Sequence, residues 1–210
     1  PILPKRLLDC RDFETLDEYL RLALEEDGAW NDVTTLAIAS ESALARATMI
    51  VKQRGVFCGA LAAERVFRLM DSRMNIEPLL ADGAWAEAGT PAMRVRGPLR
   101  GLLSAERLAL NLVQRLSGIA TLTRRFVEAA GGRAMILDTR KTTPLWRALE
   151  RYAVRAGGAA NHRFALDDMF MIKDNHADAA GGVGAAVRRA AEYRQALAAR
   201  GKPLLRIAAE

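Results

Sequence analysis

The sequence of 210 residues predicts an α/β protein in two parts, a mixed layer of helices and strands over residues 1–115 and parallel βαβ units over residues 116–210. Short strand patterns separated by turns dominate the first part, whereas strand and helix patterns alternate in the second. A complete eight-fold α/β barrel takes about 250 residues, so the second part suffices for roughly three or four units. We therefore expect an incomplete barrel, truncated at residue 210.

The first part opens with a helical pattern and continues with strands. Apolar residues three and four apart over residues 16–24 predict a helix that ends at residues 26–28. Strand-like stretches follow at residues 45–51 and 92–95, with turns between them. A long helix is expected to start near Ser104, because its hydroxyl can cap the first turn.

The second part alternates strands and helices, which is typical of parallel βαβ units. Three apolar runs each predict a buried parallel strand, at residues 134–137, 169–172 and 204–207. Thr143 and Pro144 suit the N-cap and the first position of a helix after the first of these strands. A further helix is expected from about residue 183 to residue 199, and residues 177–186 are interpreted as a loop that leads into it.

Composition narrows the class of function. The formal net charge of +6 is spread along the chain, whereas a nucleic-acid binder would more often cluster its basic residues or interleave them with aromatics. No apolar run approaches the ~18 residues of a membrane span, and the chain starts without a leader pattern, so a cytoplasmic protein is expected. Cys10 and Cys58 support neither a zinc site nor a disulfide scaffold. Small anionic ligands are the expected partners.

Charged and polar residues follow the predicted strands, where ligands bind in parallel α/β folds. They are Asp138, Arg140 and Lys141 after the first strand, His162 and Arg163 in a later loop, and Lys173, Asp174 and His176 after the second strand. So many cations at one end of the sheet would repel one another unless a ligand with several negative charges lay among them. Asp138 and Asp174 are either counter-ions that orient these cations or metal ligands.

Several motifs occur in order along residues 20–176. They are Glu26–Gly28, Asp32–Thr35, Leu103–Arg107, Leu116–Thr121, Ile136–Pro144, Leu149–Val154, Asn161–Arg163 and Ile172–His176. Together they closely resemble the quinolinate phosphoribosyltransferase family, also called nicotinate-nucleotide pyrophosphorylase (carboxylating). The resemblance implies an N-terminal open-faced α/β sandwich domain followed by an incomplete α/β barrel, with the boundary between residues 115 and 116.

The resemblance also implies an activity. Quinolinate and phosphoribosyl pyrophosphate would give nicotinate mononucleotide, pyrophosphate and CO₂ in NAD biosynthesis, with Mg²⁺, in a homodimer or higher homo-oligomer. By motif match, Arg140, His162, Arg163 and Lys173 would hold the two quinolinate carboxylates. Lys141 would lie near the phosphoribosyl donor, Arg107 would reach the partner subunit's site, and Lys141 and Lys173 are the catalytic candidates.

This sequence departs from the family pattern at several places. Leu145, Trp146 and Arg147 stand where the family commonly has Gly-Leu-Arg, and Asn31 stands where a glycine is usual. The family's later acidic residues and its glycine-rich phosphate loop should lie near or beyond position 210, and Glu210 is a candidate for the first of those acids. Two other interpretations stay open: a pyrophosphorylase-like paralogue acting on another aromatic acid, and a catalytically incompetent fragment that only binds anions.

Overall fold

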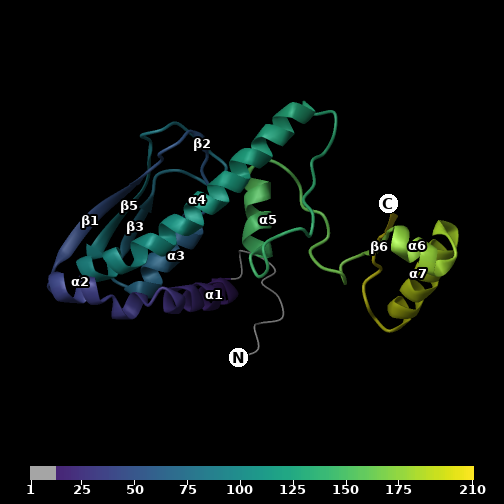
Figure 1. Ribbon diagram of the computed structural model, residues 1–210, viewed down its shortest axis with the longest axis horizontal. Helices are drawn as coiled ribbons and strands as arrows, with labels where there is room; N and C mark the ends of the chain where they lie inside the picture. The colour runs from purple at the N-terminus through teal and green to yellow at the C-terminus, as the bar shows by residue number, and fades with distance from the viewer. Residues whose placement is uncertain (1–12) are drawn as a thin grey trace. The chain divides into compact units, whose positions relative to one another are not determined.

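The structure is a computed structural model that describes the backbone from residue 13 and the side chains from residue 16, so Cys10 lies outside the described residues. It contains two compact units, which meet in sequence between Asn161 and His162 and are described separately below. In Figure 1 the elements of the first unit are α1 (Phe13–Glu26), the 3₁₀ helix η1 (Ala29–Asn31), α2 (Val33–Ile38), β1 (Leu44–Ile50), β2 (Gly55–Val56), α3 (Ala60–Met70), β3 (Asn75–Pro78), β4 (Trp85–Ala86), β5 (Pro91–Pro98), α4 (Leu99–Ala130) and α5 (Arg147–Ala156). The second unit holds β6 (Phe170–Ile172), α6 (Asp174–Ala180), α7 (Val183–Ala199) and β7 (Ile207–Ala209).

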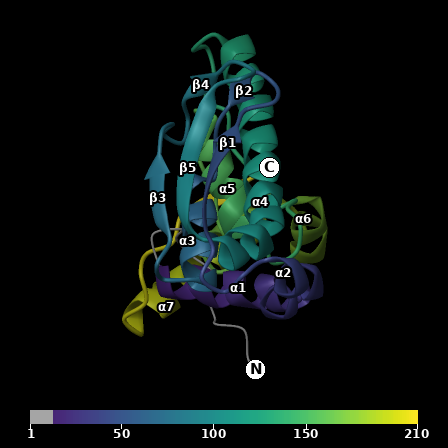
Figure 2. The same cartoon turned by 90° about the vertical axis from the view of Figure 1, so that its left-hand side faces the viewer.

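The first unit is built on an antiparallel sheet with the strand order β1-β5-β3. Exposure alternates along β1, as expected for a strand with one face on a core and one in solvent. Figure 2 shows the sheet in front of the helices of this unit, with no helix across its outer face. This is the open-faced α/β sandwich that the resemblance implies, and the strands expected at residues 45–51 and 92–95 are confirmed as β1 and β5.

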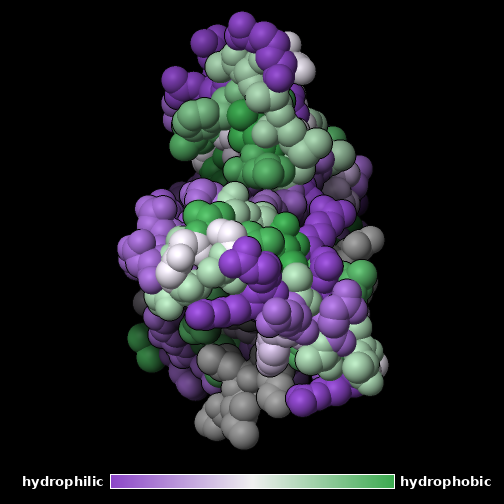
Figure 3. Space-filling view, turned by 90° about the vertical axis from the view of Figure 1, so that its right-hand side faces the viewer, coloured by the Kyte–Doolittle hydropathy of each residue, from purple (hydrophilic) through white to green (hydrophobic). Residues whose placement is uncertain are grey.

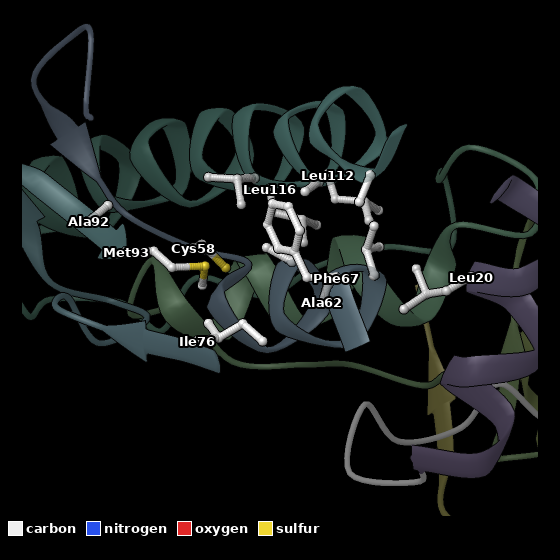
Figure 4. Packing of buried hydrophobic residues seen from close by; sticks show 14 of the residues in the cluster. Leu20, Cys58, Ala62, Phe67, Ile76, Ala92, Met93, Leu112 and Leu116 are labelled. Atoms are coloured by element: carbon white, nitrogen blue, oxygen red, sulfur yellow. The ribbon is translucent and has the colours of Figure 1, made fainter. Parts of the chain in front are cut away.

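The core of the first unit lies between the inner face of the sheet and the helices behind it (Figure 4). Leu112 and Leu116 of α4 are fully buried, and Phe67 of α3 and Met93 of β5 belong to the same cluster. Leu20 of α1 is also fully buried, which confirms the amphipathic helix expected at residues 16–24. Burying one such side chain stabilises the fold by roughly 1.5–3 kcal/mol.

Helix α4 begins before the predicted start at Ser104. Its N-cap is Pro98, and the Ser104 hydroxyl instead donates a hydrogen bond to Oδ2 of Asp32 at 3.1 Å. The predicted start was wrong because residues 99–103 are already helical, so Ser104 lies inside the helix, where no free N-terminal N–H groups are left for its hydroxyl to accept from. The helix runs without a break through residue 115, so the predicted domain boundary between residues 115 and 116 lies inside it. The two compact units instead divide the chain by packing. The domain boundary between residues 115 and 116 stays a prediction.

Two hydroxyls on α4 attach the short β2 segment to the helix. The backbone N–H of Val56 donates to Oγ1 of Thr121 at 2.8 Å, and the N–H of Cys58 donates to Oγ of Ser117 at 2.9 Å. Ser117 also donates its hydroxyl proton to the carbonyl of Cys58. Because β2 pairs only with β4, these side chains satisfy backbone groups that would otherwise be buried unpaired. Ser117 and Thr121 of the family motif therefore have a structural role.

The segment that precedes α5 differs from the prediction. The expected strand at residues 134–137 is reduced to a single parallel bridge between Leu137 and Ala160. The helix begins at Arg147 instead of Thr143 and Pro144. Leu145 takes the left-handed conformation with a φ of 66°, which a continuing right-handed helix cannot contain.

The second unit contains a parallel pair of strands, β6 and β7, in which Phe170 lies opposite Ile207. Helix α7 matches the expected residues 183–199, whereas the expected loop at 177–186 begins inside a second helix, α6. The last strand begins at Ile207, later than expected. Hydrophobic and hydrophilic surface are intermingled on the face in Figure 3. The α/β fold class is confirmed by this mixture of helices with antiparallel and parallel strands.

No helix among the described residues is both long enough and apolar enough to span a membrane. Cys58 is fully buried in the core of the first unit.

Candidate active site

The predicted site residues are divided between the two units. Arg107, Arg140 and Lys141 belong to the first unit, and His162, Arg163, Lys173 and Glu210 belong to the second. We describe each group within its own unit, and the roles of these residues stay predictions.

Arg140 and Lys141 lie in a tight turn after the parallel bridge. The N–H of Thr142 donates to the carbonyl of Arg140 at 2.9 Å, and the N–H of Lys141 donates to the Thr139 hydroxyl at 3.2 Å. The Lys141 side chain is exposed. The Nε of Arg140 is buried and has no hydrogen-bond partner within the described part of the chain. A buried guanidinium nitrogen without an acceptor is costly.

Asp138 supports the chain just before this turn. Its Oδ2 accepts a hydrogen bond from Nε of Arg151 on α5 at 2.8 Å and another from Nδ2 of Asn161 at 2.5 Å. The Asp138 N–H donates to the carbonyl of Ala160, next to the parallel bridge. Of the two roles left open for Asp138, the contacts favour the counter-ion, but its cation is Arg151 instead of Arg140 or Lys141.

Glu150 anchors the other end of the same segment. Its carboxylate accepts hydrogen bonds from Nη2 of Arg115 at 2.7 Å and from the Thr143 hydroxyl at 2.8 Å. Burial opposes ionisation of Glu150, but the hydrogen bonds from Arg115 and Thr143 outweigh it and hold its pKa below the usual value. The segment from Asp138 to Arg147 is therefore held by an acid at its start and by an acid of α5 near its end.

Arg107 lies on α4 with an exposed side chain. It forms no hydrogen bond or ion pair within residues 16–210. An exposed arginine on a helix is free to contact another molecule, but nothing in this chain assigns one to it.

In the second unit, Lys173 and Glu210 follow the two parallel strands. Lys173 comes directly after β6 and Glu210 directly after β7, and the Nζ of Lys173 forms an ion pair with the Glu210 carboxylate. The N–H of Glu210 donates to the carbonyl of Ile172, which continues the parallel ladder. The carboxyl edge of this pair therefore presents a lysine and an acid side by side, as the sequence predicted for strand ends.

Two further contacts hold the neighbouring residues of this unit. The N–H of Lys173 donates to Nδ1 of His176 at 3.0 Å, which caps α6. Arg163 donates from Nη1 to the carbonyl of Met169 at 3.4 Å, and Asp168 accepts from the N–H of Phe164. His162 is half-buried on the same loop. The loop that carries His162 and Arg163 is thus closed by its own hydrogen bonds.

The supporting residues Arg115, Arg151 and Asn161 were not among the predicted site residues. Arg151 and Asn161 lie inside motifs that carry the family resemblance, but their contacts with Asp138 require a turn that no sequence period reveals. Across residues 16–210, no three His, Cys, Asp or Glu side chains lie together in a way that could hold a metal ion. The described residues therefore do not by themselves supply a metal site.

An open-faced sandwich followed in sequence by a unit with a parallel strand pair defines a two-part α/β protein. Residues 32–117 match the family model of the quinolinate phosphoribosyl transferase N-terminal domain, and residues 119–199 match that of its C-terminal domain. The chain belongs to the quinolinate phosphoribosyl transferase family.

Curated relatives and solved structures agree with this assignment. A probable nicotinate-nucleotide pyrophosphorylase (carboxylating) of Synechocystis sp. is 44% identical over 174 residues, covering 82% of this chain and 59% of that protein. The corresponding protein of Mycobacterium leprae is 42% identical over 188 residues, covering 87% of this chain and 65% of its own length. The crystal structure of NadC from Streptococcus pyogenes superposes with a TM-score of 0.82 at 42% identity, covering 85% of this chain and 64% of that one. The chain thus spans less than two thirds of the length of these relatives.

Proposed function

We propose that the protein transfers the phosphoribosyl group of phosphoribosyl pyrophosphate to quinolinate with decarboxylation, giving nicotinate mononucleotide, pyrophosphate and CO₂. The observation that carries this proposal is the match of both family domains, in order, over residues 32–199. Relatives that bear the name of this activity are 42–44% identical.

Quinolinate carries two carboxylates on adjacent ring carbons, and the proposed binding residues are Arg140, His162, Arg163 and Lys173. Arginine can bind a carboxylate through two parallel hydrogen bonds, whereas lysine supplies a compact point charge. The buried Nε of Arg140 supports this assignment because it needs an acceptor that the described part of the chain does not supply. Lys141, exposed beside it, would face the phosphates of the donor.

The reaction requires the protein mainly to orient the two substrates and to balance their charges. The ring nitrogen of quinolinate forms a bond to the anomeric carbon of the ribose as the bond from that carbon to pyrophosphate breaks. Lys141 and Lys173 would stabilise the charge that develops on the leaving group and the ring. The carboxylate next to the ring nitrogen then leaves as CO₂, its bonding electrons remain on the ring carbon beside the cationic nitrogen, and a proton replaces it. The substrate is its own electron sink, so no nucleophilic triad is needed.

The proposal has three further parts: the metal, the oligomer and the location. Mg²⁺ would accompany the donor, and no step above depends on a metal held by the protein, since the described residues form no such group. The protein would act as a homodimer or higher homo-oligomer, with the exposed Arg107 reaching the partner subunit's site. The cytoplasm is the proposed location.

The test is release of labelled CO₂ from carboxyl-labelled quinolinate by the purified protein with phosphoribosyl pyrophosphate and Mg²⁺. Product formation in the wild type and its loss in Arg163→Ala are expected, with Arg200→Ala at the end of α7 as a matched arginine control. Turnover of nicotinate or another aromatic acid in place of quinolinate would favour the paralogue. Anion binding without turnover of any of these acids would favour the incompetent fragment.

A further inference from the structure

The outer face of the sheet in the first unit carries two arginines directly opposite each other. Arg46 of β1 pairs in register with Arg96 of β5, and Arg96 pairs on its other side with Asn75 of β3. Both arginines are exposed, and the sheet face on which they lie is not crossed by a helix (Figure 2). Side chains opposite each other in an antiparallel pair have Cβ atoms roughly 4.5–5.5 Å apart. Two cationic side chains therefore leave the sheet from adjacent positions on neighbouring strands.

The neighbouring arginines show that this pair is exceptional. Arg94, two residues along β5, contacts Glu77 of β3 at 3.3 Å, and Arg73 contacts Asp71 at 2.7 Å. Arg46 and Arg96 have neither a carboxylate nor any other hydrogen-bond partner within residues 16–210. Like charges directly opposite each other destabilise a sheet. Arg94 has the carboxylate of Glu77 opposite it on β3, whereas Arg96 has the neutral Asn75 there and Arg46 on its other side.

A hollow lies over the same row. It has a volume of about 590 Å³, and its lining includes Arg46, Arg73, Asn75 and Arg96. Leu44 and Pro98, the next pair on the same face of β1 and β5, form its apolar side. Leu44 is 77% exposed, so an apolar surface is open to solvent beside the cations. The hollow is open to solvent and combines three arginine side chains and an amide with an apolar wall.

We propose that this hollow binds a nucleotide, with its polyphosphate group between Arg46, Arg73 and Arg96 and its base against Leu44 and Pro98. A polyphosphate places several negative charges along one chain, so a single ligand can neutralise Arg46 and Arg96 on two strands and also contact Arg73, which Asp71 already neutralises. A lone carboxylate carries one charge and could neutralise only one of the two unpaired arginines. The apolar wall favours a ligand with a flat ring over inorganic phosphate. This site is separate from the proposed active-site residues of the first unit, none of which lines the hollow.

The experiment uses ATP as the probe and compares two double variants of equal charge. Arg46→Gln with Arg96→Gln removes the unpaired row, whereas Arg68→Gln with Arg94→Gln removes two arginines that already have carboxylate partners. We expect the first variant to bind ATP at least tenfold more weakly in calorimetric titration and the second to change affinity less than twofold. Any ATP bound at the proposed active site is common to both variants and cancels in the comparison.

A second measurement locates the ligand. Photolabelling with 8-azido-ATP is expected to modify peptides that contain residues 44–46 or 96–98 in the wild type and to fail in the first double variant. Equal losses of affinity in the two variants, or labelling confined to other peptides, would overturn the proposal in favour of general surface charge. Tripolyphosphate binding as tightly as ATP would overturn the assignment to a nucleotide. Unchanged circular dichroism of both variants shows that the comparison is made between folded proteins.

Discussion

Arg151 on α5 and Asp138 form a buried ion pair, with 2.8 Å between Nε and Oδ2 and with side chains that are 10% and 5% exposed. Asn161 completes the contact by donating both to Asp138 and to the backbone carbonyl of Arg151. The pair joins α5 to the segment that leads into Arg140, so the position of that arginine depends on a charge interaction inside the first unit.

Replacing Asp138 with asparagine is expected to lower the free energy of unfolding by about 3 kcal/mol, because Arg151 would keep its charge in a buried position without its ion-pair partner. Urea denaturation followed by circular dichroism measures this loss. The matched control is Glu77→Gln, which breaks an ion pair whose side chains are 47% and 52% exposed. That variant should lose less than about 1 kcal/mol. Similar losses in the two variants would contradict the importance of burial.

Two glycines near the contact of α4 with α5 should respond to alanine in opposite directions. A Cβ added to Gly157 would lie 2.5 Å from the carbonyl oxygen of Ala120 and 2.5 Å from Cβ of Thr123. Because a helix backbone cannot yield easily, Gly157→Ala should destabilise the protein by about 1–3 kcal/mol. Gly118 lies within α4 and its added Cβ would meet nothing within 4 Å. Gly118→Ala should therefore stabilise the helix by roughly 0.5–1 kcal/mol, and thermal unfolding of both variants gives the comparison.

Leu145 is expected to be a source of backbone strain. It is the one non-glycine residue with a positive φ in the described chain, at 66°, and its side chain is 60% exposed, so little packing is lost on its removal. A left-handed conformation costs a residue with a Cβ roughly 1–2 kcal/mol, while glycine adds conformational entropy to the unfolded chain. Leu145→Gly should raise stability by about 0.5–1 kcal/mol. Leu166→Gly, also at an exposed loop leucine, should lower it; a loss in both would show that Leu145 is unstrained.

The lowered pKa of Glu150 predicts a stability that depends on pH. A carboxyl whose pKa is lower in the folded protein than its ordinary 4.5 stabilises the fold above that value, and the contribution is lost as the pH falls through the folded pKa. The difference in unfolding free energy between wild type and Glu150→Gln should be constant near neutral pH and shrink as the pH falls below about 4.5. Urea titrations between pH 7 and pH 3 are the measurement. A difference that stays constant over this range would mean that Glu150 is not ionised in the way its contacts require.

The proposed oligomer can be tested by mixing two inactive variants. If Arg107 acts in the partner subunit's site, Arg107→Ala combined with Lys173→Ala restores one intact site in each mixed dimer. Random exchange makes about half of the dimers mixed, so about a quarter of the wild-type activity is expected. In the control mixture, Arg107→Ala is combined with Lys202→Ala in place of Lys173→Ala. This mixture gives the activity expected when one of the two chains behaves like the wild type. No recovery after confirmed subunit exchange would place Arg107 in its own subunit's site or in a structural role.

Hydrophobic periodicity predicted the long elements well. Helix α7 covers the residues that its sequence pattern predicted. The apolar side chains of α1 lie on one face of the helix, and Leu20 and Leu24 on that face are buried. The capping predictions failed because both helices begin elsewhere. Helix α4 already begins at Leu99, and the left-handed Leu145 delays the start of α5 to Arg147. The hydroxyls of Ser104 and Thr143 donate instead to Asp32 and Glu150. A capping residue type alone does not reveal where the backbone becomes helical.

The sequence predicted which residues make up the candidate site, but it did not predict the contacts that hold those residues in place. Lys173 and Glu210 were both named from the sequence, and their ion pair at the end of a parallel strand pair follows from that placement. The ion pair of Asp138 with Arg151 joins a strand end to a helix within the same unit. Helix α6 was interpreted as a loop because alanine and glycine dominate residues 177–186, although His176 caps its first turn.

The sequence of helix α5 matches the C-terminal family domain, but the helix packs with the residues of the N-terminal family domain. It lies within the residues that match the C-terminal model, yet its Leu149 and Ala153 are buried in the core of the first unit. Tyr152 donates to Asp82, the same acid that accepts the N–H groups at the start of α3. A chimera that exchanged the two domains of related proteins at residue 118 would therefore place a foreign helix in this core. Recombination between homologues should tolerate a crossover after residue 161 better than one at the boundary between the family models.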